Sequence, residues 1–314
     1  MPANTKEVKQ RLNSINNTRK ITKAMELVAA AKMRKSVEAT LRTRNYHAFA
    51  WGIVDRLINS QLWFDSISPV KRFFEPNRVD GQAGESNTQE HTTLIVFTSN
   101  RGLCGAFNSN IIKLAAPYLK ENKNTELITI GNRGASTLTA LGKEIKLAYQ
   151  KNDTAIEDSS VREIIDHVYY KFKNGETDKV LVAYTDYKSA ISQNAVLKQL
   201  YPFSRTQQFG LGQNDTSRKM EDMKQAPKNL EYLYEPNKYD LLEYLALRIG
   251  QAELYQALLE SNASEHSSRM VAMKNATDAA KEMAEDLVLV FNKARQAAIT
   301  QEIAEISAGT AAVS

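Results

Sequence analysis

The chain has 314 residues, of which 42% are hydrophobic and 25% charged, a composition typical of a globular protein with one or two domains. A single cysteine (Cys104) excludes an intramolecular disulfide framework, and four scattered histidines give no metal-ligand spacing, so neither a zinc site nor a Cys/His hydrolase is predicted. The net charge of +5 is unevenly distributed: residues 1–64 hold 12 Lys/Arg against 4 Asp/Glu, and residues 237–314 hold 7 against 11.

The sequence predicts neither a membrane span nor a secretory leader. No run approaches the roughly 20 apolar residues that a bilayer requires. The first residues, MPANTKEVKQRLN, lack the apolar core of a signal peptide. From the sequence we therefore expect a soluble, cytoplasmic protein.

The N-terminal segment is predicted to form one long helix. Asn4, followed three residues later by Glu7, resembles a capping box. Helical continuation to about Leu62 would give a length of roughly 90 Å. Apolar or small residues recur at spacings of three and four, at Val8, Leu12, Ile15, Thr18, Thr22, Met25, Ala29, Met33 and Val37. Because several of these side chains are small, the face suits one close partner helix.

The middle of the chain has the pattern of a small α/β domain. Strands are predicted at 92–99, 126–131 and 145–150, and two more within 179–187 and 189–203; helices are predicted at 106–122, 135–142 and 159–173. This alternation indicates a mostly parallel, Rossmann-like sheet with helices on both faces and an antiparallel last pair. The flanking segments 66–91 and 203–236, rich in polar residues, Pro and Gly, are predicted to be loops.

A second long helix is predicted from Asn237 to the C-terminal region, with Asp240 in its first turn. Gly250 costs about 1 kcal/mol relative to Ala, too little to interrupt so long a pattern. The acidic C-terminal helix and the basic N-terminal helix could pair as an antiparallel coiled coil. Two helices of this length cannot both be buried in one compact domain. Either the rod is exposed or another protein encloses it.

Few residues suggest catalysis. The turn RGLCG (101–105) stands between a strand and a helix, where α/β folds often hold phosphate, but it matches neither GxGxxG nor a P-loop, so a structural turn is favoured. Glu302 and Glu305 share one helical face, which is typical of a solvated or partner-facing edge. The cations of the first helix are spread around it and no aromatic precedes Tyr46, which disfavours nucleic-acid binding.

The two ends of the chain resemble the gamma subunits of F-type ATP synthases. The matching segments include INNTRKITKAMELVAAAKMRKS (15–36), TSNRGLCGAFN (98–108), LYEPN (233–237) and SRMVAMKNATDAAKEM (268–283). The last segment, VFNKARQAAITQEIAEISAGTAA (290–312), contains the family's C-terminal pattern at Ile299, Thr300, Glu302, Glu305 and Gly309, with Thr310 where Ala or Ser is usual.

The resemblance implies a non-catalytic rotor. In that family the paired terminal helices form an asymmetric shaft inside a ring of three alpha and three beta subunits, and the α/β domain lies near the epsilon subunit and the membrane c-ring. It also implies a peripheral position on the cytoplasmic face of a bacterial plasma membrane, coupling of ion flow to ATP synthesis or hydrolysis, no cofactor and no nucleic acid.

The matched motifs suggest which residues contact the ring. Lys23, Met25 and Arg269 are expected to face the beta-subunit levers. Contacts with the ring's inner loops near the tip are expected at Arg295, Gln296, Thr300 and Glu302. For each residue the alternative is a stabilising contact between the two shaft helices. An apolar tip around Ile303, Ile306, Ala308 and Val313 is expected to turn within an apolar collar.

The predicted organisation is an N-terminal coiled-coil helix (1–65), a central α/β domain (90–205), a linker (206–236) and a C-terminal coiled-coil helix (237–314). Two other functions stay open from the residues alone: a coiled-coil adaptor or nucleic-acid-binding rod, and an enzyme that uses the α/β domain. Neither explains the terminal motifs.

Overall fold

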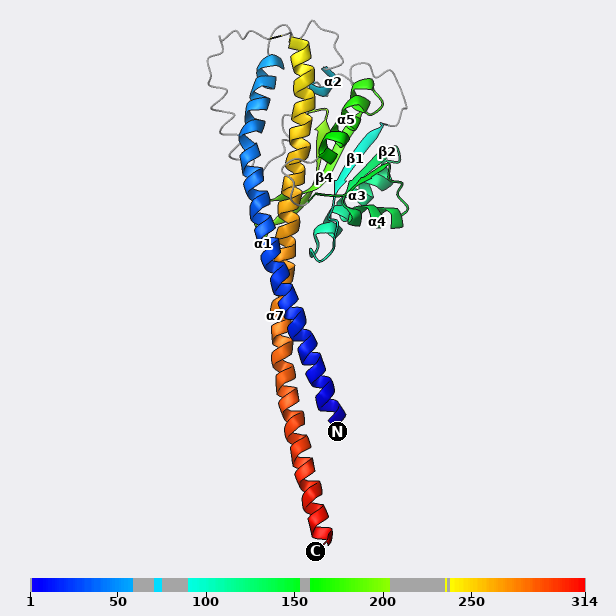
Figure 1. Cartoon of the computed structure of the whole chain (residues 1–314). Coiled ribbons are helices and arrows are strands. Elements are labelled where there is room, and N and C mark those ends of the chain that lie inside the picture. Colours follow the sequence, from blue (N-terminus) through cyan, green and yellow to red (C-terminus); the bar gives the residue numbers. More distant parts are fainter. Residues whose placement is uncertain are drawn as a thin grey trace. The chain divides into compact units, whose positions relative to one another are not determined.

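The computed structural model describes residues 2–58, 71–74, 90–152, 159–203, 235 and 238–313. The chain divides into two compact units. The helical unit comprises Met1–Ala30 and Arg269–Ser314, and the α/β unit comprises Ala31–Ser268. Two long helices, α1 (Pro2–Ile58) and α7 (Lys238–Val313), contribute to both units (Figure 1). The predicted terminal helices are thus present, with 59–62 and Asn237 outside the described residues.

A five-stranded sheet forms the centre of the α/β unit. Its strands are β1 (Thr92–Phe97), β2 (Thr125–Ile130), β3 (Leu147–Tyr149), β4 (Lys179–Tyr187) and β5 (Gln193–Tyr201). They lie in the order β3-β2-β1-β4-β5. The first four are mutually parallel, and β5 pairs antiparallel with β4. The mixed sheet expected from the sequence is confirmed.

Helices cover both faces of this sheet. On one face, Leu94 and Val96 of β1 pack with residues of α3 (Phe107–Glu121) and α4 (Asn132–Ala140). On the other face, Ile95 and Phe97 pack with α5 (Ser159–Asn174) and with α7. Every residue of β1 is buried, which explains its continuous apolar run: a central parallel strand has no solvated face.

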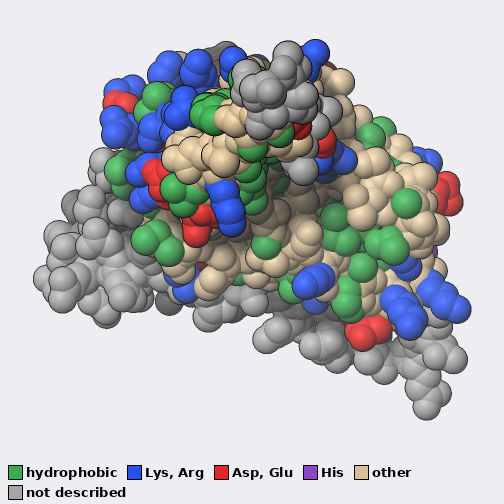
Figure 2. All heavy atoms as spheres, turned by 90° about the horizontal axis from the view of Figure 1, so that it is seen from below, with side chains coloured by type: hydrophobic (Ala, Val, Ile, Leu, Met, Phe, Trp, Pro, Cys, Tyr) green, Lys and Arg blue, Asp and Glu red, His purple; other side chains and the backbone are tan. Residues whose placement is uncertain are grey.

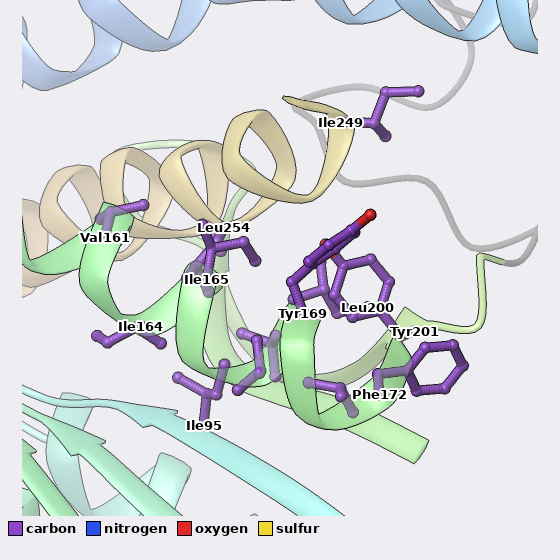
Figure 3. Packing of buried hydrophobic residues seen from close by; sticks show 14 of the residues in the cluster. Ile95, Val161, Ile164, Ile165, Tyr169, Phe172, Leu200, Tyr201, Ile249 and Leu254 are labelled. Carbon is purple, nitrogen blue, oxygen red and sulfur yellow. The ribbon is translucent and has the colours of Figure 1, made fainter. Parts of the chain in front are cut away.

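The core between α5, α7 and the sheet is rich in aromatic rings. Figure 3 shows Tyr169 and Phe172 of α5 and Tyr201 of β5 close to Leu200, with Ile249 and Leu254 on α7. The ring centroids of Phe172 and Tyr201 are 5.5 Å apart. Polar contacts add to this packing, because Lys171 and Lys173 of α5 bond to Glu126 of β2 and Glu243 of α7. Helix α5 is therefore anchored to both the sheet and α7.

One short helix was missed by the sequence analysis. Residues 66–91 were predicted to be a loop, but α2 (Lys71–Phe74) lies within them. Phe73 is fully buried, its ring centroid 4.9 Å from that of Tyr169 and 5.0 Å from that of Tyr201. The ring contacts of the adjacent residues Phe73 and Phe74 thus hold this segment on the core, although its composition is typical of a loop. The rest of 66–91 lies outside the described residues, except 90 and 91.

Gly250 has a packing role that the helical pattern did not reveal. The hydroxyl of Tyr201 approaches α7 here and donates a hydrogen bond to the carbonyl of Ala246, at 3.4 Å. A Cβ at position 250 would lie 1.9 Å from that hydroxyl oxygen and 2.8 Å from the ring carbon that bears it. Glycine is therefore used for close approach of the tyrosine to the helix.

We predict that Gly250→Ala destabilises the chain, although alanine is the better helix former. Overpacking costs about 1–3 kcal/mol, which exceeds the gain in helix propensity of about 1 kcal/mol. The measurement is denaturant unfolding of the full chain. In a Tyr201→Phe background, which lacks the clashing oxygen, the cost should be smaller. A stabilising Gly250→Ala in the wild-type background would contradict this packing account.

Candidate functional site

All seven residues proposed as ring contacts lie in the helical unit. On α1, the ammonium group of Lys23 donates to Oε1 of Glu26 at 3.0 Å. The Lys23 side chain is 54% exposed and that of Glu26 only 15%, so the lysine stays accessible while its partner is partly covered. Met25 is half-buried, and its thioether side chain is therefore partly available to another protein.

The five proposed contact residues on α7 lie at two places along the helix. Arg269 is half-buried at the start of the α7 segment of the helical unit. Arg295, Gln296, Thr300 and Glu302 are exposed. At 1.5 Å per residue, Arg269 and Arg295 are about 39 Å apart along the helix axis. The structure therefore brings four of these residues together near the C-terminal end of α7 and leaves Arg269 far from them.

The hydroxyl of Thr300 is already used within α7. Its Oγ1 donates to the backbone carbonyl of Gln296 at 2.9 Å, a common way for threonine to satisfy its donor in a helix. Its oxygen lone pairs remain for an external donor. Arg295 and Gln296 supply exposed donors one turn away, and Glu302 supplies acceptors. This surface suits hydrogen bonding to a partner.

The seam between α1 and α7 in the helical unit is narrow. Its buried residues are Val8, Thr22, Ala29, Met273, Ala280 and Ala284. The hydroxyl of Thr277 on α7 donates to that of Thr22 on α1 at 2.8 Å. The thin, small-residue face expected from the sequence is confirmed at Thr22 and Ala29. Thr18, expected on the same face, is exposed.

The end of α7 exposes large apolar side chains. Ile299, Ile303 and Ile306 are 48%, 59% and 68% exposed, and every residue from 299 to 308 is exposed. This agrees with the apolar tip expected around Ile303, Ile306 and Ala308; the side chain of Val313 lies outside the described residues. Closely spaced exposed isoleucines on one helix are typical of a surface that another protein covers.

The turn after β1 is filled by its own side chains. Asn108 accepts from the backbone N–H of Ser99 at 2.9 Å and donates to Ser99 Oγ at 2.7 Å and to Cys104 Sγ at 3.2 Å. Leu103 takes a left-handed backbone conformation at φ 62° and is 63% exposed. These internal bonds hold the turn against the start of α3. They support the structural interpretation of RGLCG, and the thiol of Cys104 is buried.

The sequence analysis missed a buried polar stretch on α7 in the α/β unit. Its residues are almost fully buried and polar or charged, as follows: Glu253, Gln256, Glu260, Ser261, Asn262, Ser264, Glu265, His266 and Ser267. From the sequence this part of α7 is predicted only as the continuation of one long helix. The available signal was the sequence ESNASEHSS (260–268), a helical segment that is polar on all sides.

A buried ion pair lies at the centre of this stretch. Lys151, just after β3, donates to Oε2 of Glu265 at 2.6 Å and to Oγ of Ser261 at 3.3 Å. The two charged side chains are 0% and 2% exposed. The Lys151 ammonium group also lies 5.3 Å from the ring centroid of Phe107. This lysine therefore ties the sheet edge and the start of α3 to α7.

Helix α1 joins the same stretch through a side-chain relay. Thr43 donates to Oε1 of Gln256 at 2.5 Å, and the amide nitrogen of Gln256 donates to Glu260 at 3.0 Å. Figure 1 shows α1 and α7 side by side in the α/β unit and running in opposite directions. The ion pairs described on α1 are formed within the helix, as between Arg42 and Glu38. Attraction between the oppositely charged helices stays a prediction.

Comparison with known proteins decides the family. The family model described as ATP synthase matches residues 4–313. The ATP synthase gamma chain of Cupriavidus metallidurans is 37% identical over 99% of this chain and 100% of its own length. That of Heliobacterium modesticaldum is 36% identical over 98% of each chain, and that of Histophilus somni is 33% identical over 99% and 100%. The chain belongs to the ATP synthase gamma-chain family.

Solved structures show the same fold. The central stalk of the Tetrahymena thermophila mitochondrial ATP synthase matches with a TM-score of 0.57 and 24% identity, over 82% of this chain and 99% of that one. A chain of the Euglena gracilis mitochondrial ATP synthase matches with a TM-score of 0.61 and 18% identity, over 100% and 95%. The fold of this chain is therefore shared with chains of solved ATP synthase structures.

Two further observations concern the described residues only. None of their helices contains a stretch long and apolar enough to cross a membrane. On the face drawn in Figure 2, Lys and Arg side chains form several separate groups with hydrophobic side chains between them.

We predict that Lys151→Met destabilises the chain by about 3–5 kcal/mol, because it removes the buried counter-charge of the Glu265 carboxylate. The matched control is Lys146→Met, at an exposed lysine five residues earlier, where a change within about 0.5 kcal/mol is expected. Both are measured by denaturant unfolding of the full chain.

The double variant Lys151→Met with Glu265→Leu tests whether the Glu265 carboxylate, once it has lost its counter-charge, causes this loss of stability. Removing both charges should recover much of the lost stability, since the uncompensated carboxylate is gone. Equal effects of Lys151→Met and Lys146→Met would show that the buried pair does not hold α7 to the sheet.

Proposed function

We propose that this chain is the central-stalk rotor subunit of an F-type ATP synthase. Rotation of the chain within a hexamer of alpha and beta subunits would set the conformations of the catalytic sites and couple ion flow to ATP synthesis or hydrolysis. The observation that carries the proposal is similarity to ATP synthase gamma chains over essentially the whole chain. Structural likeness to stalk and rotor chains supports it.

The proposed partners follow from this assignment. They are the alpha and beta subunits around the helical unit, the epsilon subunit, and the membrane c-ring. The protein would act at the cytoplasmic face of a bacterial plasma membrane as a peripheral component of an ion-translocating complex. It would supply no catalytic residue and no cofactor site, because the nucleotide chemistry would take place in the ring.

The helical unit has the features that such a role requires. Two paired helices have no threefold symmetry, so three equivalent neighbours would each meet a different surface. An element can bias alternative conformations only through unequal contact with them. The exposed Arg295, Gln296 and Glu302, with the uncovered Ile303 and Ile306, are the part of α7 on which we place the tip contacts. We place Lys23, Met25 and Arg269 at the beta-subunit levers.

We also propose a division of the chain by role. Residues 1–65 and 237–314 would form the coiled-coil shaft, and residues 90–205 the α/β domain. The intervening linker 206–236 lies outside the described residues, except Glu235. The structural boundary between the two units falls instead at Ala30/Ala31 and Ser268/Arg269, within the long helices. Parts of the proposed shaft therefore belong to the α/β unit.

We predict that Met25→Lys impairs coupling more than assembly. The half-buried thioether would be replaced by a cation, which would alter the contact with a beta subunit without removing the seam residues Thr22 and Ala29. Membrane vesicles with the variant complex should keep most of their ATP hydrolysis while ATP-driven ion pumping per ATP hydrolysed falls several-fold.

The control is Leu141→Lys, an apolar-to-lysine change at a 54% exposed position after α4 in the α/β unit. It should leave the ratio of pumping to hydrolysis unchanged. The proposed role of Met25 would be wrong if pumping per ATP in Met25→Lys equalled that of the Leu141→Lys control.

A further inference from the structure

Glu260 of α7 and Asp186 of β4 interact through their side chains where α7 packs on β4, one turn of α7 from the hydrogen bond that Ser264 Oγ donates to the carbonyl of Thr185 at 3.1 Å. Glu260 of α7 is 0% exposed, and its Oε1 accepts from the amide nitrogen of Gln256 at 3.0 Å. Its second oxygen, Oε2, is buried and accepts no hydrogen bond from any described donor. Oδ1 of Asp186 on β4 is in the same condition. When ionised, both carboxylates can only accept hydrogen bonds, so neither can donate one to the other.

The surroundings of the pair contain more acid than base. Besides burial, the charges of Glu260 and Asp186, and more weakly that of Glu253 on α7, raise the pKa of the neighbouring Tyr184 hydroxyl on β4. Lys198 of β5 is the cation that acts on Glu260, and its ammonium group lies 5.6 Å from the centroid of the Tyr184 ring.

Helix α1 adds no charge to this site through its described contacts. It reaches Glu260 through the neutral hydroxyl of Thr43, by way of Gln256. Its nearby charged residues Glu38 and Arg42 pair with each other on an exposed surface. One lysine thus faces several carboxylates in a buried environment, in which two adjacent anions are costly.

We propose that Glu260 and Asp186 form a proton-binding site, in which one proton held between the two carboxyl groups stabilises the packing of α7 on the sheet and is released at alkaline pH. The proton gives one carboxyl an O–H that donates to the other. Both buried oxygens then have a partner, and one negative charge is removed.

The electrostatics agree with this geometry. Burial and the neighbouring Asp186 raise the pKa of Glu260 to about 8, against the opposing effects of Gln256 and Lys198. Glu260 therefore keeps its proton at neutral pH and loses it as the pH rises past about 8.

Because the pKa of Glu260 is raised in the folded chain, its contribution to folding stability decreases as the pH rises. In the unfolded chain Glu260 loses its proton near its ordinary pKa of 4.5, while in the folded chain it keeps the proton to about pH 8. The contribution of the pair to stability is fully present below the lower value and is lost as pH rises toward the higher one. Alkaline conditions therefore weaken the contact between α7 and β4. Both Glu260 and Asp186 lie inside the α/β unit.

Infrared spectroscopy of the full chain tests the proton directly. The wild-type chain should show the carbonyl stretch of a buried protonated carboxyl at neutral pH, and this band should disappear as pH passes through about 8. Glu260→Gln should lack the band. Glu282→Gln, at an exposed glutamate of the same helix, should retain it. A wild-type chain with no such band at neutral pH, or a band that persists in both Glu260→Gln and Asp186→Asn, would overturn the proposal.

Unfolding equilibria give a second readout. Glutamine keeps the size of Glu260 and cannot ionise, so Glu260→Gln should gain stability relative to wild type as pH rises. The ratio of the unfolding constant of the wild type to that of Glu260→Gln should increase by up to about tenfold per pH unit between the two pKa values. The corresponding ratio for Glu282→Gln should stay flat. A ratio for Glu260→Gln that does not change with pH would also overturn the proposal.

Discussion

Helix α7 buries a polar and charged surface against the sheet, and the α/β unit depends on this contact. Its apolar residues between Leu242 and Leu258 close the core over α5 and the sheet. The following turns bring Glu260 and Glu265 into the interior, where burial of a charge is costly unless it is paired or neutralised. Lys151 supplies the counter-charge for Glu265. The packing of α7 on the sheet is thus specified by matched polar groups as well as by apolar surface.

The helical unit is held together by much smaller side chains. Its seam is made largely of alanines and threonines, whereas the core of the α/β unit contains aromatic rings in mutual contact, such as Phe73, Phe172 and Tyr201. Each buried CH₂ contributes about 0.8 kcal/mol, while an aromatic side chain buries about 150–250 Å². Most of the apolar stabilisation therefore lies in the α/β unit. Small seam residues allow close approach of two helices, and exposed Ile303 and Ile306 leave apolar surface for a partner.

Much of the fold could be predicted from the sequence because its signals are local. The buried strand TTLIVF (92–97), the helical spacing of the two ends and the positions of Gly and Pro all depend on neighbouring residues. The position of α2 could not be predicted, because Phe73 is ordered by rings more than 90 residues away. The Lys151–Glu265 pair is separated by 114 residues and has no local pattern. For the same reason the roles of Met25, Arg295 and Thr300 rest on family resemblance, since their contacts would be made with other chains.

The central claim is that one copy of this chain serves as the shaft of a rotary complex. Native mass spectrometry of the complex isolated through a tag on this chain from its own cells tests it most directly. The account predicts an assembly with one copy of this chain and three copies each of two larger, nucleotide-bearing subunits. Recovery of the chain only as a monomer or homodimer, under extraction gentle enough to keep such rings intact, would contradict it.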